Sequence, residues 1–222
     1  MWDDVEEIPS NFRRPAVRAS VASLRAHFAS EVARRRTPLR NPHHELEISE
    51  ADRQRAQASA VLIPVIEHAE GLGLLLTRRH EEISFAGHLC FPGGRCDPAD
   101  ANTTATALRE SHEEIDLEPG QVEVLGELGG YVSKNGFHIT AVVGLVRPPL
   151  DLTPHPREVE EILEIPLDYA LRSDSYRLVR RDPEAGWAVF YLEYGEAIVT
   201  GPTISLLMGF YEELLKTHEP AA

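Results

Sequence analysis

The segment that most constrains the fold of this chain runs from Phe91 to Leu117 and reads FPGGRCDPADANTTATALRESHEEIDL. It starts at the end of an apolar strand, turns at Gly93 and Gly94, and crosses a polar loop into a helix expected from about Thr104 to Asp116. Glycine lets the backbone turn sharply and come close to a ligand. The segment therefore predicts a strand and a helix that are joined by a turn open to a ligand.

The predicted helix carries an apolar stripe and an acidic face. If Leu108 is placed at zero on a wheel of about 100° per residue, Ser111 and Ile115 lie within about 60° of it. Three carboxylates lie about 140° to 240° away, on the opposite side. They belong to Glu110, Glu113 and Glu114. Like charges at these spacings repel each other and destabilise a helix.

The acidic face has two interpretations. A hard divalent cation such as Mg²⁺ takes carboxylate oxygens as ligands and would remove the repulsion. A run of acidic residues is also common on a solvated helix face. Arg109 stands next to Glu110 and can pair with a carboxylate to fix its conformation. The cluster is a candidate metal site, with the solvated face as the alternative.

Apolar periodicity predicts the other helices and strands. Helices are expected over residues 16–36, over residues 157–172 with an interruption at Pro166, and from Pro202 to about Thr217. Strands are expected over residues 60–67, 72–79, 88–91, 121–132, 138–146, 176–181 and 187–194. Because strands and helices do not alternate regularly, an α+β fold or an α/β sandwich with a mixed sheet is favoured over a Rossmann fold.

The 222 residues suit one catalytic domain with a terminal arm better than two full domains. We expect an N-terminal helical arm and linker over residues 1–57, with Pro38 and Pro42 in the linker, and the domain itself over residues 58–218. The arginines at positions 34–36 fall in the last turn of the arm's helix, where cations suit the helix dipole. An anion-binding arm is the alternative.

Charge and composition argue against several classes of protein. Lys and Arg number 22 and Asp and Glu number 36, so the formal net charge is −14, which disfavours nucleic acid and anionic membranes as partners. The acidic N-terminus has no apolar signal region, and no window approaches the roughly 18 apolar residues of a membrane span. Two cysteines cannot form a disulfide framework. We therefore expect a cytoplasmic protein.

At residues 94–117 the chain resembles the Nudix hydrolases. Their signature is G, five residues, E, seven residues, and then R-E-U-x-E-E-x-G-U, where U is a bulky aliphatic residue. The positions that match directly are Gly94, Arg109, Glu110, Glu113, Glu114 and Leu117. A pattern with this many fixed positions is far more specific than a lone glycine-rich loop.

Three positions depart from this signature. Asp100 stands where the first glutamate is expected, with eight residues instead of seven before Arg109. Ser111 stands at the first aliphatic position. Asp116 replaces the glycine after the helix, and aspartate is among the residues that tolerate left-handed geometry there. None of the three removes the R-E-x-x-E-E core.

The flanks resemble one branch of this family, the coenzyme A diphosphatases. The upstream motif of that branch is L-L-T-x-R-S, three residues, R, three residues, G, three residues, F-P-G-G. This chain has LLTRR at 75–79, Gly87 and FPGG at 91–94, with His80 in place of Ser and Ser84 in place of Arg. Arg78 or Arg79 would have to compensate for that missing arginine.

The resemblance implies a Nudix fold, an α/β/α sandwich around a mixed sheet, and a Mg²⁺- or Mn²⁺-dependent diphosphatase. The substrate would be the small molecule coenzyme A or one of its thioesters, cleaved to 3′,5′-ADP and (acyl-)4′-phosphopantetheine. It implies that Glu110, Glu113 and Glu114 bind the metal and that Arg109, Glu110 and Glu113 act in catalysis. It also implies substrate contacts, for which the candidates are Arg78, Arg79, Gly93 and Gly94. A homodimer is left open.

Five residues are secondary candidates for the same site: Asp100, Lys134, His138, Glu158 and Glu161. A later glutamate reaches the metal from a loop in many Nudix enzymes, and Glu158 or Glu161 could do so here, with an exposed helix start as the alternative. His138 could touch the ligand or act on a proton, but a lone histidine more often has a structural role. Lys134 could meet phosphate or simply belong to a loop before a strand.

Two other functions fit the same residues. His80 and Ser84 depart from the motif of the coenzyme A branch. The first alternative is therefore a Nudix pyrophosphatase that acts on ADP-ribose or another nucleoside diphosphate derivative. A non-catalytic nucleotide-sensing module is the second alternative. The retained carboxylates at 110, 113 and 114 argue against it, because such a module need not keep charge that destabilises a helix.

Overall fold

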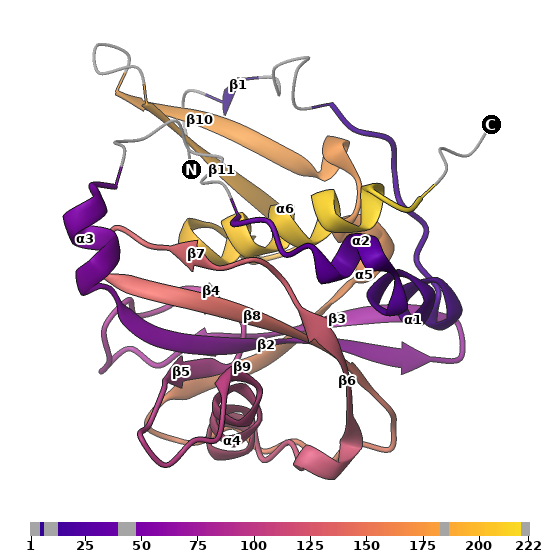
Figure 1. The fold of residues 1–222 in the computed structure, drawn as a ribbon, viewed down its shortest axis with the longest axis horizontal. Helices are drawn as coiled ribbons and strands as arrows, with labels where there is room; N and C mark the ends of the chain where they lie inside the picture. The colour runs from indigo at the N-terminus through magenta and orange to yellow at the C-terminus, as the bar shows by residue number, and fades with distance from the viewer. Residues whose placement is uncertain (1–4, 7–12, 40–47, 183–186, 219–222) are drawn as a thin grey trace.

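The structure is a computed structural model that describes residues 5–6, 13–39, 48–182 and 187–218, and Figure 1 shows its arrangement. The strands are β1 (Val5–Glu6), β2 (Gln57–His68), β3 (Gly71–Arg79), β4 (Leu89–Cys90), β5 (Gly93–Arg95), β6 (Val122–Glu127), β7 (Tyr131–Val132), β8 (Phe137–Val146), β9 (Val159–Pro166), β10 (Tyr176–Asp182), β11 (Trp187–Tyr194) and β12 (Ala197–Val199). The α-helices are α1 (Val21–Ala29), α2 (Glu31–Arg34), α3 (Glu50–Arg55), α4 (Thr103–Ile115), α5 (Leu167–Ala170) and α6 (Gly201–Leu215).

The central sheet is mixed, as expected from the sequence. Its main path runs β4-β3-β2-β8-β6, with β5 beside β2, β7 beside β8 and β9 beside β3. Strands β2 and β8 run parallel over ten paired residues, from Gln57 opposite Phe137 to Ile66 opposite Val146. The other pairs of this sheet are antiparallel. The parallel pair brings two segments that are about eighty positions apart in the chain into the middle of the domain.

Both faces of the central sheet are buried. Along β2, Leu62 and Ile66 belong to the core under α4, whereas Ile63 and Val65 belong to a larger core on the other face. This alternation follows from the two-residue period of a strand. A strand that is buried on both faces has a nearly continuous run of apolar residues. This run is why the sequence predicts β2 correctly.

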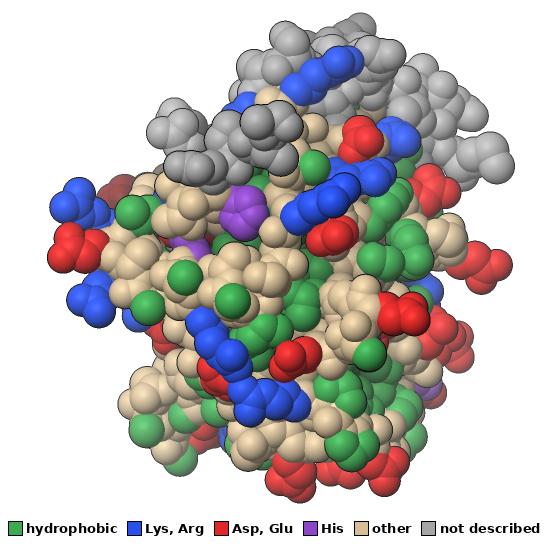
Figure 2. Space-filling view, turned by 90° about the vertical axis from the view of Figure 1, so that its right-hand side faces the viewer, with side chains coloured by type: hydrophobic (Ala, Val, Ile, Leu, Met, Phe, Trp, Pro, Cys, Tyr) green, Lys and Arg blue, Asp and Glu red, His purple; other side chains and the backbone are tan. Residues whose placement is uncertain are grey.

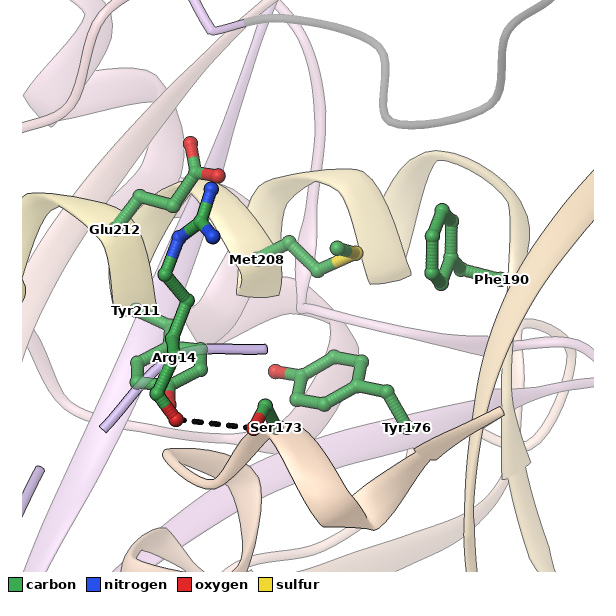
Figure 3. Close-up of a pocket in the computed structure, with 7 residues that line it drawn as sticks. All are labelled: Arg14, Ser173, Tyr176, Phe190, Met208, Tyr211 and Glu212. Atoms are coloured by element: carbon green, nitrogen blue, oxygen red, sulfur yellow. Dashed lines mark hydrogen bonds between the residues drawn. The ribbon is translucent and has the colours of Figure 1, made fainter. Parts of the chain in front are cut away.

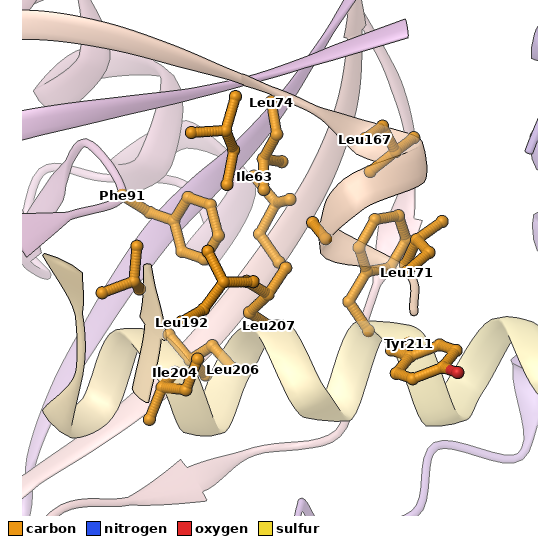
Figure 4. Packing of buried hydrophobic residues seen from close by; sticks show 14 of the residues in the cluster. Ile63, Leu74, Phe91, Leu167, Leu171, Leu192, Ile204, Leu206, Leu207 and Tyr211 are labelled. Atoms are coloured by element: carbon orange, nitrogen blue, oxygen red, sulfur yellow. The ribbon is translucent and has the colours of Figure 1, made fainter. Parts of the chain in front are cut away.

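Helices cover both faces of this sheet. Helix α4 lies on one side, and α1 and α6 lie on the other (Figure 1). In the larger core, Ile63 and Leu74 from the sheet share one cluster with Leu207 of α6 and Leu192 of β11 (Figure 4). The expected α/β/α sandwich is confirmed. A second, antiparallel sheet of order β1-β10-β11-β12 lies beyond α6 and contains the strands that were expected at 176–181 and 187–194.

The prediction of a helix over residues 157–172 is wrong. Residues Val159–Pro166 form β9, which pairs with β3 from Gly73 opposite Pro166 to Arg79 opposite Val159. Only Leu167–Ala170 form a short helix. Val159 and Ile165 are buried on the sheet, where β-branched side chains pack well. Pairing with β3 therefore overrides the helical spacing of the apolar residues.

Several other boundaries differ from the sequence-based expectation. The helix expected over 16–36 is interrupted at Ser30, which has an extended backbone and accepts a hydrogen bond from the N–H of Ala33 at 3.3 Å. The strand expected over 121–132 is divided into β6 and β7. Elements β1, α3, β5 and β12 were not predicted. The linker residue Pro42 lies outside the described residues.

The N-terminal segment packs on the rest of the chain. Leu24 of α1 is fully buried in the larger core. Arg25 donates two hydrogen bonds of 2.7 Å to the Glu123 carboxylate, and Arg36 pairs with Glu127. Figure 2 shows the face at the right of Figure 1, where basic side chains are interspersed with acidic ones. In the described ranges, no helix combines the length and the apolar character that a membrane span needs.

Candidate active site

Helix α4 is fixed at both ends. The Asn102 side chain accepts a hydrogen bond from the N–H of Ala105 at 2.9 Å and caps the first turn. At the other end, Asp116 adopts the left-handed conformation, with φ 58° and ψ 29°. This confirms that aspartate takes the geometry for which the Nudix signature uses glycine. The caps set where the three glutamates of the helix stand relative to the sheet.

The buried face of α4 is rotated from the one expected. Its buried residues are Thr106, Ala107, Ser111, Glu114 and Ile115, while Leu108 is only half-buried. Glu114 is therefore 6% exposed, whereas the Glu113 side chain is 56% exposed. The expectation that the three carboxylates share one face opposite the buried stripe is wrong for Glu114, which is buried on the same side of the helix as Ala107 and Ser111.

Glu114 is a buried carboxyl group held against the glycine turn. Its Oε2 accepts a hydrogen bond from the N–H of Gly93 at 3.1 Å. The pKa of Glu114 is raised to about 7, chiefly by burial. The charges of Glu110 and Glu158 also raise this pKa, while the Gly93 N–H and the Arg79 charge lower it. A carboxylate at this position is strongly desolvated and lies among like charges.

Glu110 lies directly over Gly94. A Cβ atom on Gly94 would stand 2.4 Å from the Glu110 Cδ and 2.5 Å from its Oε2. The absence of a side chain on Gly94 is therefore what allows this carboxyl group to reach β5. Burial raises the pKa of Glu110, the neighbouring Arg109 lowers it, and the charges of Glu113 and Glu158 raise it.

Arg109 connects the acidic groups. Its guanidinium donates to both Asp100 oxygens at 3.0 Å, to Glu113 Oε2 at 3.0 Å, and to the backbone carbonyl of Arg95 at 3.1 Å. It also lies 2.9 Å from Glu110 Oε1. A planar guanidinium suits such two-oxygen contacts. The structure thus brings together Asp100, Arg109, Glu110 and Glu113, as the sequence predicts for one site.

The two arginines at the end of β3 have different partners. Arg78 donates from Nε to Glu161 Oε2 at 3.0 Å, and Arg79 donates from Nε to the carbonyl of Ser84 at 2.9 Å. The charge of Arg79 acts on Glu114. Arg79 is therefore close to the carboxylate cluster, whereas Arg78 is engaged on the neighbouring strand β9.

The two later glutamates, Glu158 and Glu161, have different partners. Glu158 is exposed in the turn before β9, and its charge acts on both Glu110 and Glu114. Glu161 lies on β9 opposite Arg78 and forms the ion pair with it. No helix starts here, so the alternative of an exposed helix start is wrong. Glu158 is therefore the one of these two glutamates whose charge acts on the glutamates of α4.

Lys134 and His138 lie around the loop before β8. Lys134 is exposed in the turn between β7 and β8. His138 is exposed at the start of β8, and its ring fills the space that a side chain on Gly130 would need.

Two features near α4 were not identified from sequence. Arg95, which directly follows the glycine pair, lies over the Phe137 ring at 5.5 Å and accepts a hydrogen bond from Arg109 on its carbonyl. Its position directly after Gly94 is the sequence feature that could have identified Arg95 as a residue near the site. At the far end of α4, His112, Asp116 and Glu118 place one ligand atom each within 4.8 Å of one another, but all three are exposed.

A separate small pocket lies beside α6 and does not include the carboxylate cluster (Figure 3). It is lined by Arg14, Ser173, Tyr176, Phe190, Met208, Tyr211 and Glu212. Its hydroxyl groups bind backbone carbonyls: Ser173 donates to Arg14 at 3.0 Å and Tyr211 donates to Pro15 at 2.6 Å. These contacts hold the N-terminal segment against α6.

The carboxylates of the cluster have the chemistry that could hold a cation. Glu110 and Glu114 are desolvated, repel each other, and are further opposed by Glu158. Mg²⁺ and Mn²⁺ prefer carboxylate oxygens as ligands. The side chains at 110, 113 and 114 fit a divalent cation, because such an ion would compensate the like charges that burial makes unfavourable.

Comparison with known proteins gives a family, two relatives and a solved structure. The NUDIX domain family model matches residues 56–184. The uncharacterized Nudix hydrolase NudL of Photorhabdus laumondii is 39% identical over 153 residues, which are 67% of this chain and 80% of that protein. The mouse peroxisomal coenzyme A diphosphatase NUDT7 is 42% identical over 118 residues, which are 53% of this chain and 50% of that protein. Among solved structures, the Nudix hydrolase RenU of M. smegmatis is 18% identical, with a TM-score of 0.49 over 75% of this chain and 91% of that chain.

Proposed function

The chain belongs to the NUDIX domain family and is a Nudix hydrolase, and from this premise we propose that its substrate is coenzyme A or a coenzyme A thioester. Hydrolysis of the diphosphate bond would give 3′,5′-ADP and 4′-phosphopantetheine or its acyl form. The observation that carries the proposal is the 42% identity to a coenzyme A diphosphatase over 118 residues. The LLTRR, Gly87 and FPGG positions, which resemble the motif of that branch, support it.

We further propose that Glu110, Glu113 and Glu114 hold Mg²⁺ or Mn²⁺. The burial of two of these carboxylates and their mutual repulsion support this assignment. When bound, such a cation polarises a phosphoryl oxygen and lowers the pKa of a coordinated water. Glu158 is a further candidate, since its charge already acts on both buried glutamates.

The residues of the chain itself would then position the reaction. A water oxygen forms a bond to one phosphorus of the diphosphate, the bridging P–O bond breaks, and the bridging oxygen leaves with the other phosphate. Glu110 or Glu113 accepts the proton of the water, a type of step that typically contributes about 10²–10⁴ in rate. Arg109 contacts both glutamates and would keep their carboxylates oriented. Gly94 leaves room for the Glu110 carboxyl group over β5, and Arg79 would bind the charge of the diphosphate.

A Nudix pyrophosphatase for ADP-ribose or another nucleoside diphosphate is the second candidate. The observation that favours it is Ser84, which stands where the coenzyme A branch has an arginine. The Ser84 carbonyl accepts a hydrogen bond from the Arg79 side chain. The guanidinium of Arg79 therefore lies next to the position where the coenzyme A branch has its arginine. The two candidates differ in the substrate and share the same cleavage chemistry.

A substrate panel with Mg²⁺ decides between them. We would measure kcat/KM for coenzyme A, ADP-ribose, NADH and diadenosine polyphosphates, with Glu110→Gln as the inactive control and Glu160→Gln, an exposed glutamate of β9, as the matched control. Coenzyme A should have the highest kcat/KM. A tenfold preference for ADP-ribose, about 1.4 kcal/mol in transition-state stabilisation, would reassign the substrate.

The proposal also covers the class of partner, the location in the cell and the oligomeric state. The net charge of −14 supports a small-molecule substrate in place of nucleic acid or an anionic membrane. A cytoplasmic location is proposed with it. A homodimer stays open, and light scattering after size-exclusion chromatography would determine the mass in solution.

A further inference from the structure

Phe85 is an aromatic side chain displayed on the surface. It lies in the loop between β3 and β4 and is 53% exposed, more than any other large hydrophobic side chain that the structure describes; Ile198 follows at 42%. Its φ of 63° lies in the left-handed region, which is unfavourable for a bulky residue. In the described ranges the other such non-glycine residue is Asp116, where the end of α4 explains it. Strain of this kind is often kept at binding sites.

The loop around Phe85 is held by its own hydrogen bonds. The N–H of Gly87 donates to the Arg79 carbonyl at 2.9 Å, and the N–H of His88 donates to the Phe85 carbonyl at 3.2 Å. The Arg79 side chain donates to the Ser84 carbonyl at 2.9 Å. The His88 ring stands at 69° to the Phe85 ring with centroids 6.1 Å apart, so it does not stack flat on it. These hydrogen bonds fix the backbone of the loop that carries the Phe85 ring.

The same loop is connected to the proposed diphosphatase site at its start. The N–H of His80 donates to the carbonyl of Glu158 at 2.9 Å, and the Glu158 charge acts on Glu110 and Glu114. The Arg79 guanidinium donates a hydrogen bond to the carbonyl of Ser84, the residue before Phe85. Its positive charge lowers the pKa of Glu114. A flat group attached to a diphosphate that Arg79 binds would therefore come within reach of the loop that carries Phe85.

We propose that the Phe85 ring is a stacking platform for the nucleobase of the substrate. The proposal rests on the proposed function, because the base is the planar part of a nucleoside diphosphate derivative. A chain with a net charge of −14 gains no long-range attraction for a polyanion, so local contacts must supply the affinity. A base can stack on an aromatic ring whatever its hydrogen-bonding edge. Phe85 supplies such a ring next to a cationic residue.

The test uses ligands that are not hydrolysed. Equilibrium dissociation constants for AMP and for the base-free ribose 5-phosphate would be measured by calorimetry with Mg²⁺, for the native chain and for Phe85→Leu and Phe85→Trp. Phe85→Leu should weaken AMP binding about tenfold, equivalent to about 1.4 kcal/mol, and leave ribose 5-phosphate unchanged. Phe85→Trp should keep AMP binding. Tyr194→Leu, which removes an exposed aromatic on β11, is the matched control and should change neither constant.

The possible outcomes separate the two proposals. Equal AMP binding by the native chain and Phe85→Leu, or no measurable AMP binding by the native chain, would overturn the platform. A loss of dimer mass in Phe85→Leu with AMP binding unchanged would assign the ring to contact between two copies and also overturn it. Normal hydrolysis of coenzyme A with either result leaves the proposed function standing. Phe85-dependent AMP binding without hydrolysis of any diphosphate would support the platform and remove the proposed function.

Discussion

Two hydrogen bonds of 3.0 Å join Arg109 to Asp100, one from Nε to Oδ1 and one from Nη2 to Oδ2. The remaining terminal nitrogen, Nη1, contacts Glu113 at 3.0 Å and Glu110 at 2.9 Å. A guanidinium held by two parallel bonds cannot rotate freely. Asp100 therefore orients Arg109, and through it two of the three carboxylates that we propose as metal ligands.

Asp100→Asn should lower kcat about 10²-fold, the loss expected when a catalytic group is misplaced by about 1 Å. The amide offers one oxygen acceptor, so the second bond to Arg109 is lost. Kinetics with saturating Mg²⁺ would test this, with Asp100→Glu as the rescue variant because the Nudix signature has glutamate there. A variant that loses thermal stability but keeps the native kcat would contradict the positioning role.

The same pair makes stability depend on pH. The Arg109 guanidinium, together with the Asp97 N–H and the Thr106 hydroxyl, holds the pKa of Asp100 well below its ordinary value. A carboxyl group whose folded pKa is depressed stabilises the folded chain above its unfolded pKa of about 3.9. That contribution is lost as the pH falls below about 4. Melting temperatures of the native chain and Asp100→Asn should therefore differ at pH 7 and converge toward pH 3.

Gly94→Ala should lower kcat at least tenfold with little loss of stability. The new Cβ would lie 2.4 to 2.6 Å from the Glu110 carboxyl atoms, which can move only by leaving their place over β5. Gly120→Ala is the matched control, because no atom lies within 4 Å of a Cβ there. Native kinetics in both variants would show that the position of Glu110 over Gly94 is not needed.

Strongly periodic segments and the acidic helix were predictable because their determinants are local. Ile63 and Val65 alternate with Leu62 and Ile66 on β2, and this pattern reads as a buried strand whatever surrounds it. The R-E-x-x-E-E segment likewise identifies α4. Asp116 takes the left-handed turn at the end of that helix as a residue-level rule predicts.

Features decided by distant contacts were not predictable. The segment at 159–166 has apolar residues at both helical and strand spacings, and its antiparallel pairing with β3 selects the strand. The wheel centred on Leu108 placed Glu114 in solvent, but Ala107 and Ser111 face the sheet and turn Glu114 inward. Sequence spacing therefore brings the glutamates to one helix, while packing decides which of them is buried.

Removal of divalent metal should abolish turnover. The proposed ligands are carboxylates, which bind hard cations far better than any other group in this cluster. EDTA should reduce kcat to the uncatalysed level, and excess Mg²⁺ or Mn²⁺ should restore it. The melting temperature should rise with Mg²⁺ concentration in the native chain, because a ligand that binds only the folded state stabilises it. Undiminished turnover in excess EDTA would rule out the metal mechanism.

The charge of Glu114 should oppose folding when no metal is bound. Its pKa is raised, chiefly by burial, from 4.5 to about 7. A carboxyl group whose folded pKa lies above its unfolded pKa binds its proton more tightly in the folded state. The folded chain therefore loses stability as the pH rises from about 4.5 to 7, by up to about 3 kcal/mol at about 1.4 kcal/mol per pKa unit.

Glu114→Gln removes this charge and keeps the shape of the side chain, including an oxygen that can accept the Gly93 N–H. Without metal, the melting temperature of the variant should exceed that of the native chain at pH 8, and the difference should shrink toward pH 4.5. With saturating Mg²⁺, kcat should fall by about 10²–10⁴, because a neutral amide oxygen is a weak ligand for a hard cation.

Glu160→Gln is the matched control, because it removes an exposed carboxylate and should change stability by no more than about 0.5 kcal/mol. Opposite effects of one substitution on metal-free stability and on kcat are expected only if Glu114 is a buried charge that the cation compensates. Native kcat in Glu114→Gln would exclude it as a metal ligand.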